Sequence, residues 1–517
     1  MAGGVGMTNA ARWTAVVFIT SLIFALTACS TGERVDLGGD TSGRLVAAIG
    51  GEPDQLDPNK TSAYFSFEVL ENVYDTLVEP DANLEMRPAL AESWDVSPDQ
   101  RTWTFHLRPN VTFHDGKPFT ADDVVYTYRR IIDEELTNAD KLSAVTDVRA
   151  TNPTTVVLQL KQPTPNLLTN LGGFKGMAIV QRENVESGQI AAHPIGTGPF
   201  SFENQKSGDS ISLKANPNYW GGVPKVAGVV FRFIPEKSTA LSALQAGEID
   251  WTDSVPTQRV NQLKDDDSLH LAVTPSNDYW YLALNEARPP WNDVRVRQAI
   301  AYGIDRDAIV AATSYGTAAA NQLAIPQGNP WYTDYHRYDY DIDRAKQLLQ
   351  EANASPQKID MLVTNEYPET VTAAQIIADN LAPLGITVDI RTVDFATWLD
   401  EQNTGHFDML MMGWLGNIDP DDFYYAQHHT DGSSNAQKYS NPEVDRLLDA
   451  GRVETDPQAR ADIYRRAATI IADECSYIFL YNPSVIQAWS PNVTGYDARR
   501  DKAIRFRTTA VNEGGAP

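Results

Sequence analysis

Three aspartates at alternate positions could form the start of a calcium-binding loop. Asp339, Asp341 and Asp343 have the spacing with which such a loop begins, and carboxylate oxygens are ligands that Ca²⁺ prefers. The sixth position of the loop needs glycine for a sharp turn, and here it is Arg344. Because Ile342 leads into a helical pattern, we expect these acids at the positive N-terminal end of a helix rather than around a metal ion.

Two pairs of neighbouring side chains could bind a metal or transfer protons. His428 and His429 are adjacent, and adjacent residues do not share a helix face, so by themselves they form a poor metal clamp. Asp421 and Asp422 are only a weak indication of acid–base chemistry in a chain with 68 acidic residues. We therefore expect no metal site.

The sequence lacks the motifs of the common enzyme classes. It contains no Gly-x-Ser-x-Gly, no phosphate-binding loop, no His-Glu-x-x-His and no Cys-x-x-Cys. The segment Gly196-Thr197-Gly198-Pro199 begins like a dinucleotide-binding loop but has no third glycine, and it fits a turn or a crossing between domains. With no nucleophile–base set in view, we expect a protein that is not an enzyme and carries no cofactor.

Aromatic residues could line a large ligand cavity. The chain has 21 Tyr, 17 Phe and 11 Trp, and several lie beside polar residues, as in Tyr279-Trp280-Tyr281, Trp331-Tyr332 and Trp414. Aromatic walls with a few polar groups are typical of ligand cavities. The core of a large α/β protein also buries such residues, so composition alone leaves both interpretations open.

The N-terminus predicts secretion and a lipid anchor. Arg12 precedes an apolar run, 13–25, that is too short to cross a bilayer as a mature helix. The run leads to Leu26-Thr27-Ala28-Cys29, which resembles a bacterial lipobox. We expect 1–28 to be removed as a signal peptide and acyl chains on Cys29 to anchor the protein at the extracytoplasmic face of the cell membrane. A plain signal peptide that ends in cysteine is the alternative. The stretch 29–43, rich in Gly, Ser, Thr and Asp, predicts a flexible tether.

The composition describes a large acidic globular protein. A length of 517 residues predicts two or three domains, and 42 basic against 68 acidic residues give a net charge of −26. That charge disfavours binding to nucleic acid and weakly favours cationic or amine-bearing solutes. Two cysteines build no disulfide framework, and Cys475 is expected to be a buried thiol.

Hydrophobic periodicity predicts strands that alternate with helices, which is typical of an α/β architecture with wound sheets. The main expected helices are 67–78, 294–302, 342–351, 370–384, 395–402, 443–451 and 457–473, and Thr120 is expected to cap another. The main expected strands are 44–49, 102–107, 279–284, 386–393, 407–412, 477–481 and 485–489.

Several motifs, in this order, resemble the peptide/nickel family of solute-binding proteins of ABC importers, family 5. The resemblance covers Leu45 to Arg505. It rests on Ala91-Glu92-Ser93-Trp94, Thr102 to Arg108, Phe113 to Val124, Gly196 to Phe200, Asn216 to Trp220, Val294 to Ile300 with Ile304-Asp305-Arg306, and Gly413-Trp414-Leu415-Gly416.

This resemblance implies a periplasmic-binding-protein-like fold of type II, a clam of two lobes with an extra domain inserted in the N-terminal lobe. The mapped boundaries are 44–83, 195–285 and 487–517 for lobe I, 84–194 for the inserted domain and 286–486 for lobe II. It also implies a monomer that binds an oligopeptide or another small solute and delivers it to ABC permease and ATPase subunits. The two lobes would capture the solute by closing about a hinge, and no covalent bond would be broken.

The resemblance further indicates ligand-binding residues. In peptide-binding relatives an aspartate after the Gly-Trp segment binds the peptide amine, but the matching residue here is Asn417, whose amide cannot form that charge-assisted bond. Asp419 is a candidate substitute. Relatives specific for dipeptides carry an arginine in the loop that here spans 364–369 and contains Glu366 but no basic residue. The other candidates are Gly416 and four aromatic residues for which core packing is the alternative role, Tyr64, Phe65, Trp280 and Trp414.

The aspartate and the arginine that fix peptide length in dipeptide-binding relatives are thus both absent at the matching positions. We therefore expect a longer peptide held through its backbone, or a different and cationic solute. Two other functions remain open. One is a receptor for a nickel chelate, haem or a siderophore. The other is a diverged lipoprotein that no longer imports and instead scaffolds or regulates cell-envelope assembly.

Overall fold

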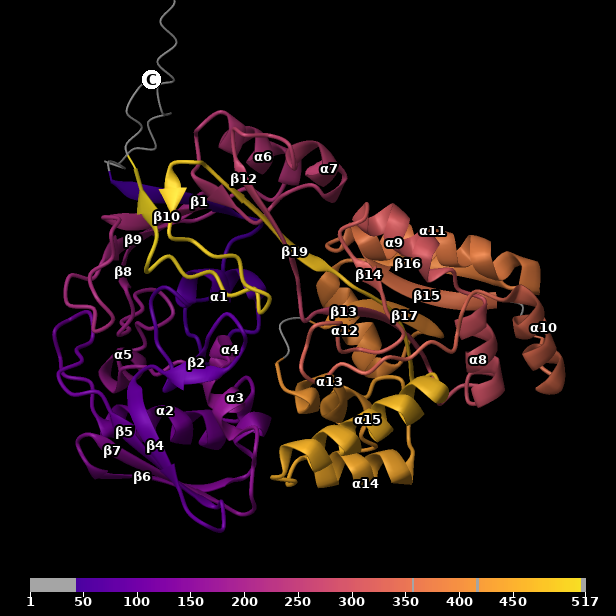
Figure 1. Cartoon of the computed structure of the whole chain (residues 1–517), viewed down its shortest axis with the longest axis horizontal. Helices are drawn as coiled ribbons and strands as arrows, with labels where there is room; N and C mark the ends of the chain where they lie inside the picture. Colours follow the sequence, from indigo (N-terminus) through magenta and orange to yellow (C-terminus); the bar gives the residue numbers. More distant parts are fainter. Residues whose placement is uncertain (1–42, 356–357, 415–417, 513–517) are drawn as a thin grey trace, which may run out of the picture. The chain divides into compact units, whose positions relative to one another are not determined.

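A seven-stranded sheet contains strands from both ends of the chain (Figure 1). The computed structural model describes residues 43–512 except 356–357 and 415–417. The strand order is β12-β19-β11-β1-β10-β9-β8. The strands are β1 (Arg44–Ile49), β8 (Phe200–Lys206), β9 (Ser210–Ala215), β10 (Gly228–Phe233), β11 (Trp251–Thr252), β12 (His270–Pro275) and β19 (Ser484–Trp489).

The central strand β1 is buried on both faces of this sheet. It pairs in parallel with β10 and with β11. Because successive side chains of a strand point to opposite faces, Leu45, Ala47 and Ile49 join one hydrophobic cluster, whereas Val46 and Ala48 join another. A continuous apolar run is typical of such a strand, and the expected strand 44–49 is confirmed.

The first helix is shorter than its hydrophobic pattern predicts. A helix was expected over 67–78, but α1 (Tyr64–Leu70) ends at Leu70. The Asn72 side chain donates to the carbonyls of Glu68 (3.0 Å) and Ile504 (2.8 Å) and accepts the Phe506 amide (3.0 Å). These bonds to the C-terminal segment draw the chain out of the helix.

A four-stranded antiparallel sheet with the order β4-β5-β7-β6 is inserted after β1. Its second strand alternates as expected, because Trp103, Phe105 and Leu107 are buried and the residues between them are not. The expected cap is present where Asp123 accepts the Thr120 amide at 2.9 Å. The elements here are β2 (Val78–Pro80), β3 (Met86–Pro88), β4 (Ala91–Val96), β5 (Thr102–Leu107), α2 (Ala121–Asp133), η1 (Ala139–Leu142), β6 (Val145–Asn152), β7 (Thr155–Leu160), α3 (Leu167–Gly172), α4 (Phe174–Met177) and α5 (Arg182–Glu186).

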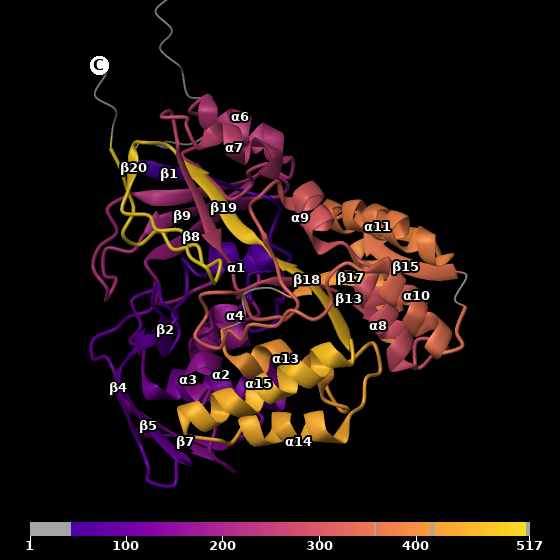
Figure 2. The same cartoon turned by 45° about the vertical axis from the view of Figure 1, so that its right-hand side comes forward.

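A six-stranded sheet forms the other large core. Its order is β14-β18-β13-β17-β15-β16. Figures 1 and 2 place α10 and α11 on one side of it and α14 and α15 on the other. The strands are β13 (Tyr279–Leu284), β14 (Ala319–Ala320), β15 (Lys358–Thr364), β16 (Thr387–Val393), β17 (Met409–Trp414) and β18 (Tyr477–Asn482).

Three helices of this part match their predicted bounds. Each follows an aspartate, Asp293, Asp341 or Asp456, whose carboxylate accepts an amide of the first turn. Asp341 is therefore a helix cap, as its sequence context indicates. The helices are α8 (Val294–Tyr302), α9 (Arg306–Ser314), α10 (Ile342–Glu351), α11 (Pro368–Leu381), η3 (Ala382–Leu384), α12 (Phe395–Thr404), α13 (Pro420–His428), α14 (Pro442–Gly451) and α15 (Pro457–Asp473).

The division between the two large sheets differs from two of the lobe boundaries expected from the sequence, which stay predictions. The strand Tyr279–Leu284 was assigned to lobe I, but β13 pairs with β17 and β18 of the six-stranded sheet. Residue 486 lies inside β19 of the seven-stranded sheet. The sheets therefore divide at 276–278 and at Pro483 instead of after 285 and 486. The remaining elements are α6 (Lys237–Gln245), η2 (Thr257–Arg259), α7 (Val260–Leu263), β20 (Val493–Thr494) and β21 (Ala510–Val511).

Cys475 is a free thiol with 1% of its surface exposed, as expected, and burial raises its pKa to about 11. Among the helices of the described residues, none is both long and apolar enough to cross a membrane.

Candidate functional site

Two short connections join the seven-stranded sheet to the six-stranded sheet. One leads from β12 to β13 through 276–278, and the other leads from β18 to β19 through Pro483. The Ser276 amide donates to the Pro483 carbonyl at 3.1 Å, and the Asn482 side chain donates to the Asp278 carbonyl at 2.8 Å. A tied pair of strands of this kind is a connection about which two lobes can close.

A polar cluster lies beside the first connection. The Lys502 ammonium is 2.5 Å from Oδ2 of Asp278 and 5.5 Å from the centre of the Tyr64 ring. The Tyr64 hydroxyl donates to the Lys502 carbonyl at 3.3 Å. Helix α1, the inter-sheet connection and the C-terminal segment therefore meet at one place, and the ring face of Tyr64 adds to the favourable environment of the ammonium.

Glu68 is the most unusual member of this cluster. It is 1% exposed, and neither carboxylate oxygen accepts a hydrogen bond from the described residues. Burial raises the pKa of Glu68 well above its usual range, the charge of Asp253 raises it further, and Lys502 lowers it. A buried carboxylate without such bonds would be costly, so Glu68 keeps its proton at neutral pH.

The carboxyl ends of parallel strands position this cluster. Asp253 follows β11 directly, and Gly50-Gly51 follows β1, its parallel neighbour. A Cβ at Gly51 would lie 2.6 Å from two carbons of the Phe65 ring, so only glycine lets this ring cover the strand end. The crevice at the carboxyl ends of strands is where open α/β sheets bind ligands.

Tyr64 and Phe65 therefore stand together at the edge of the cluster, with ring centres 6.2 Å apart, and both are half-buried. Burial, and then the charge of Glu68, raise the pKa of the Tyr64 hydroxyl, which stays protonated. The half-buried Asp253 accepts a hydrogen bond from Ser254 Oγ at 3.2 Å. The rim of the cluster is thus partly open while Glu68 forms its floor.

The six-stranded sheet contributes an aromatic wall. Trp280 on β13 stands opposite Gly413 on β17 and has its ring centre 6.0 Å from that of Tyr367. Tyr367 is half-buried, and burial raises the pKa of its hydroxyl while the charge of Lys502 lowers it. Trp280, 6% exposed, packs mainly within the core and supports this wall.

Two other residues expected from the sequence, Trp414 and Glu366, lie at or just after the carboxyl ends of β17 and β15, which pair in parallel. Trp414 is half-buried at the end of β17, opposite Tyr279. Gly416 and Asn417 lie outside the described residues. Glu366 is exposed beside Tyr367 and accepts the Thr364 hydroxyl at 2.6 Å.

Asp419 is already engaged. Arg460 donates to both of its oxygens, at 2.6 and 2.8 Å, and both side chains are buried. Asp419 also caps α13 by accepting the Asp421 amide at 3.0 Å. A ligand amine would have to displace Arg460, which makes Asp419 the weakest of the candidates for amine binding.

Sequence reasoning missed Glu68, Asp253, Asp278 and Lys502. Only Glu68 carried a signal, because it is a charged residue within the apolar run of α1. The others come from segments far apart in the chain and are brought together by the fold.

His428 and His429 contact different groups in the structure. His428 Nδ1 lies 2.9 Å from Ser476 Oγ, and burial lowers the pKa of His428 to about 3. His429 Nε2 lies 3.6 Å from Asp449 instead. In the described part of the chain, no group of three or more His, Cys, Asp or Glu side chains is arranged to hold a metal ion.

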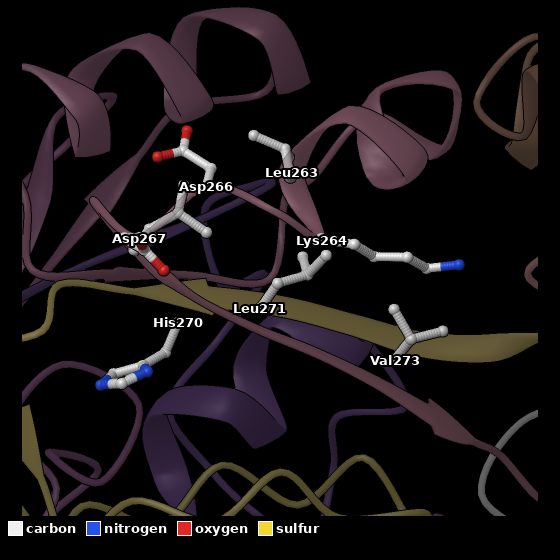
Figure 3. Close-up of a pocket in the computed structure, with 8 residues that line it drawn as sticks. Leu263, Lys264, Asp266, Asp267, His270, Leu271 and Val273 are labelled. Atoms are coloured by element: carbon white, nitrogen blue, oxygen red, sulfur yellow. The ribbon is translucent and has the colours of Figure 1, made fainter.

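A surface hollow of about 430 Å³ lies between α7 and β12 (Figure 3). Its lining includes Lys264, Asp266 and His270, whose polar ends point away from one another. A binding site needs polar groups that converge, so the cluster around Glu68 is the better candidate.

Known proteins resemble the chain over most of its length. The model of bacterial extracellular solute-binding proteins, family 5, matches residues 85–435. The dipeptide-binding protein of Escherichia coli (strain K12) is 28% identical over 87% of this chain and 91% of its own length. Haem-binding protein A of Haemophilus influenzae is 29% identical over 82% of this chain and 84% of its own.

A solved structure shares the fold. The ABC transporter-associated periplasmic binding protein DppA from Helicobacter pylori, in complex with the peptide STSA, superposes with a TM-score of 0.82 and 27% identity. The match covers 91% of this chain and 99% of that one. The two large sheets and the inserted sheet are thus those of a type II periplasmic binding protein.

Proposed function

The chain belongs to the bacterial extracellular solute-binding proteins of family 5, and from that membership we propose that it is the peptide receptor of an ABC importer. It would capture a peptide beside the tied connections between its two sheets and deliver it to a membrane permease. The observation that carries the proposal is the meeting of aromatic and charged groups next to that hinge. Relatives named for dipeptide binding, and one solved with a peptide, support it.

We assign the ligand to the space bordered by Tyr64 and Phe65 on one side and by the Trp280–Tyr367 wall on the other. Trp414 and Glu366 remain candidate contacts, and Gly416, Asn417 and Asp419 remain predictions from the sequence. Hinge closure would be driven by the higher affinity of the peptide for the closed state.

A peptide longer than two residues is the expected ligand. The loop 364–369 contains no basic residue to hold the carboxylate of a dipeptide, and Asp419 is held by Arg460. Isothermal titration calorimetry with dipeptides and with tri- to hexapeptides tests this expectation. Binding of the longer peptides supports it, and tight binding of dipeptides alone would refute it.

We further propose that Cys29, which lies outside the described residues, carries the lipid anchor of a monomeric receptor. The anchor would keep the receptor near its permease and raise their effective concentration. A Cys29→Ser variant should leave the membrane fraction, and mass spectrometry of the wild-type N-terminal fragment should find acyl chains. A wild-type fragment without lipid would exclude the anchor.

A receptor for haem is the second candidate, because a haem-binding protein is among the relatives with similar identity. Absorbance titration with haemin distinguishes the two. A Soret shift that saturates at one haem per chain, without peptide binding, would favour haem.

A further inference from the structure

Cations hold the carboxylates at the start of α13. Arg460 on α15 donates to Asp419 at 2.6 Å, and both side chains of this pair are buried. Arg452, which directly follows α14, donates to Asp421 at 3.0 Å. Because both arginines come from the helices around the same six-stranded sheet, these two pairs fix the start of α13 within its own part of the molecule.

A third cation reaches α13 from the inserted sheet. Lys141 lies in η1, between α2 and β6, and its ammonium is 3.4 Å from Oδ1 of Asp422. Among the ion pairs of the described residues, this is the only one that joins the part built on the inserted sheet to the part built on the six-stranded sheet. We propose that Lys141 and Asp422 form a latch that favours the closed arrangement of the receptor around its ligand; this inference rests on the proposed receptor function.

The carboxylate of Asp422 is held in place on its own side. Its Oδ2 accepts the Asp419 amide at 3.3 Å and so caps α13, whereas Oδ1 faces Lys141. The cap fixes the orientation of the carboxylate whether or not Lys141 is near. Forming the pair therefore costs little side-chain entropy at Asp422.

The backbone of Lys141 is anchored in the inserted part. The Asn170 side chain donates to the Lys141 carbonyl at 3.0 Å, and the next residue, Leu142, is 1% exposed and belongs to the core of that part. The side chains of Lys141 and Asp422 are only 22% and 16% exposed. Water and salt therefore screen this pair less than they screen an ion pair on the open surface.

The charges around Lys141 are complementary to its ammonium. Burial lowers the pKa of Lys141, but the charges of Asp422, Asp140 and Asp421 outweigh burial, and the pKa is raised overall. Asp140 is exposed and adjacent in the chain, and Asp421 is bound by Arg452. Asp422 is therefore the partner that links Lys141 to the six-stranded part.

The position of the pair suits a latch. The backbone links the inserted part to the six-stranded part through the seven-stranded sheet and the two connections at 276–278 and Pro483. Rotation about these connections would separate Lys141 from Asp422 without opening either core. The pair thus forms only when the two parts are close, and its free energy adds to that of the bound ligand in favour of closure.

Double electron–electron resonance on the full-length protein in detergent tests the latch. Spin labels at Asp133→Cys, the end of α2, and Arg465→Cys, on α15, report the distance between the two parts, and both positions are exposed. The probe is a pool of tetrapeptides, added at the concentration that brings half of the wild-type molecules to the short distance. The same labels are placed in each variant.

At that concentration, Lys141→Glu should show a fraction of short distances at least about three-fold smaller than wild type, because the closed state loses its latch. Asp422→Asn keeps an oxygen for the cap and should lower the fraction as well, so the test stands even if Lys141→Glu fails to fold. Lys141→Arg should resemble wild type. So should Lys161→Glu, which makes the same charge change at an exposed lysine directly after β7.

An unchanged fraction of short distances in both Lys141→Glu and Asp422→Asn would overturn the latch and leave the receptor function standing. If the pool does not change the wild-type distances, the peptide function fails, and the samples without peptide decide on the latch. Longer distances in Lys141→Glu than in wild type then support the latch, and equal distances refute it.

Discussion

Asp419 and Arg460 form a buried bidentate ion pair, with distances of 2.6 and 2.8 Å, at the start of α13. Removing one partner leaves a buried charge alone, so Arg460→Met should lower the free energy of unfolding by about 3–5 kcal/mol. Urea denaturation measures this, and Arg465→Met, an exposed position on the same helix, should change it by less than about 0.5 kcal/mol.

The same pair decides the role of Asp419. Asp419→Asn should destabilise the fold by a similar amount. A stable Asp419→Asn protein that had lost peptide binding would show instead that Asp419 is a ligand group.

Lys502 ties the C-terminal segment to the inter-sheet connection through Asp278. We expect Lys502→Met to lower the free energy of unfolding by about 1–3 kcal/mol, because the buried Asp278 carboxylate loses its ammonium. The double variant Lys502→Met/Asp278→Asn should recover part of that loss. A double-mutant cycle with purely additive effects would contradict the coupling.

Much of the fold was predictable because local patterns dominate there. The strand 102–107 alternates in sequence and in burial, and the helix 457–473 begins after its cap Asp456 and keeps its bounds. The helix expected over 67–78 failed for a non-local reason, since Asn72 bonds to Ile504 and Phe506. Periodicity carries no information about partners so distant in the chain.

The site was only half predictable for the same reason. Tyr64 and Phe65 were found through the resemblance, and the structure joins them to Lys502, Glu68 and Asp253. Those three come from the C-terminal segment, the middle of α1 and the end of β11. Neither composition nor spacing connects such positions. Asp419 was predicted to bind a ligand amine because of its charge, and only the structure shows that it forms an ion pair with Arg460.

The raised pKa of Glu68 predicts that the stability of the folded protein depends on pH. Its pKa is raised in the folded state, by burial first and by Asp253 next, whereas in the unfolded chain it is about 4.3. As pH rises above that value the unfolded state releases its proton first, so wild type loses stability until pH passes the folded pKa. Glu68→Gln removes this loss.

The Glu68→Gln variant should therefore be more stable than wild type by about 1 kcal/mol or more at pH 8, with a smaller gain at pH 5. Chemical denaturation at both values measures it, and exposed Glu92→Gln is the control. The other groups that face Glu68, namely Tyr64, Asp253, Asp278, Tyr496 and Lys502, stay in place in the variant. A gain that is equal at both pH values would contradict the argument.

At Gly198 the backbone passes so close to the Val73 carbonyl that a larger residue should destabilise the fold. A Cβ there would lie 2.6 Å from the carbonyl carbon and oxygen of Val73, whose carbonyl accepts the Gly198 amide at 2.9 Å. Gly198→Ala should cost about 3 kcal/mol of stability. Gly188→Ala, with a φ of +72° and open space around its Cβ, should cost only about 1 kcal/mol. Equal costs would show that the backbone near Val73 yields easily.

Native mass spectrometry of the protein purified from its own host tests the receptor function most directly. We predict a complex whose extra mass, after isolation and fragmentation, belongs to peptides of three or more residues with free amino termini. A co-purified haem, metal chelate or siderophore, without peptide, would contradict the proposed function.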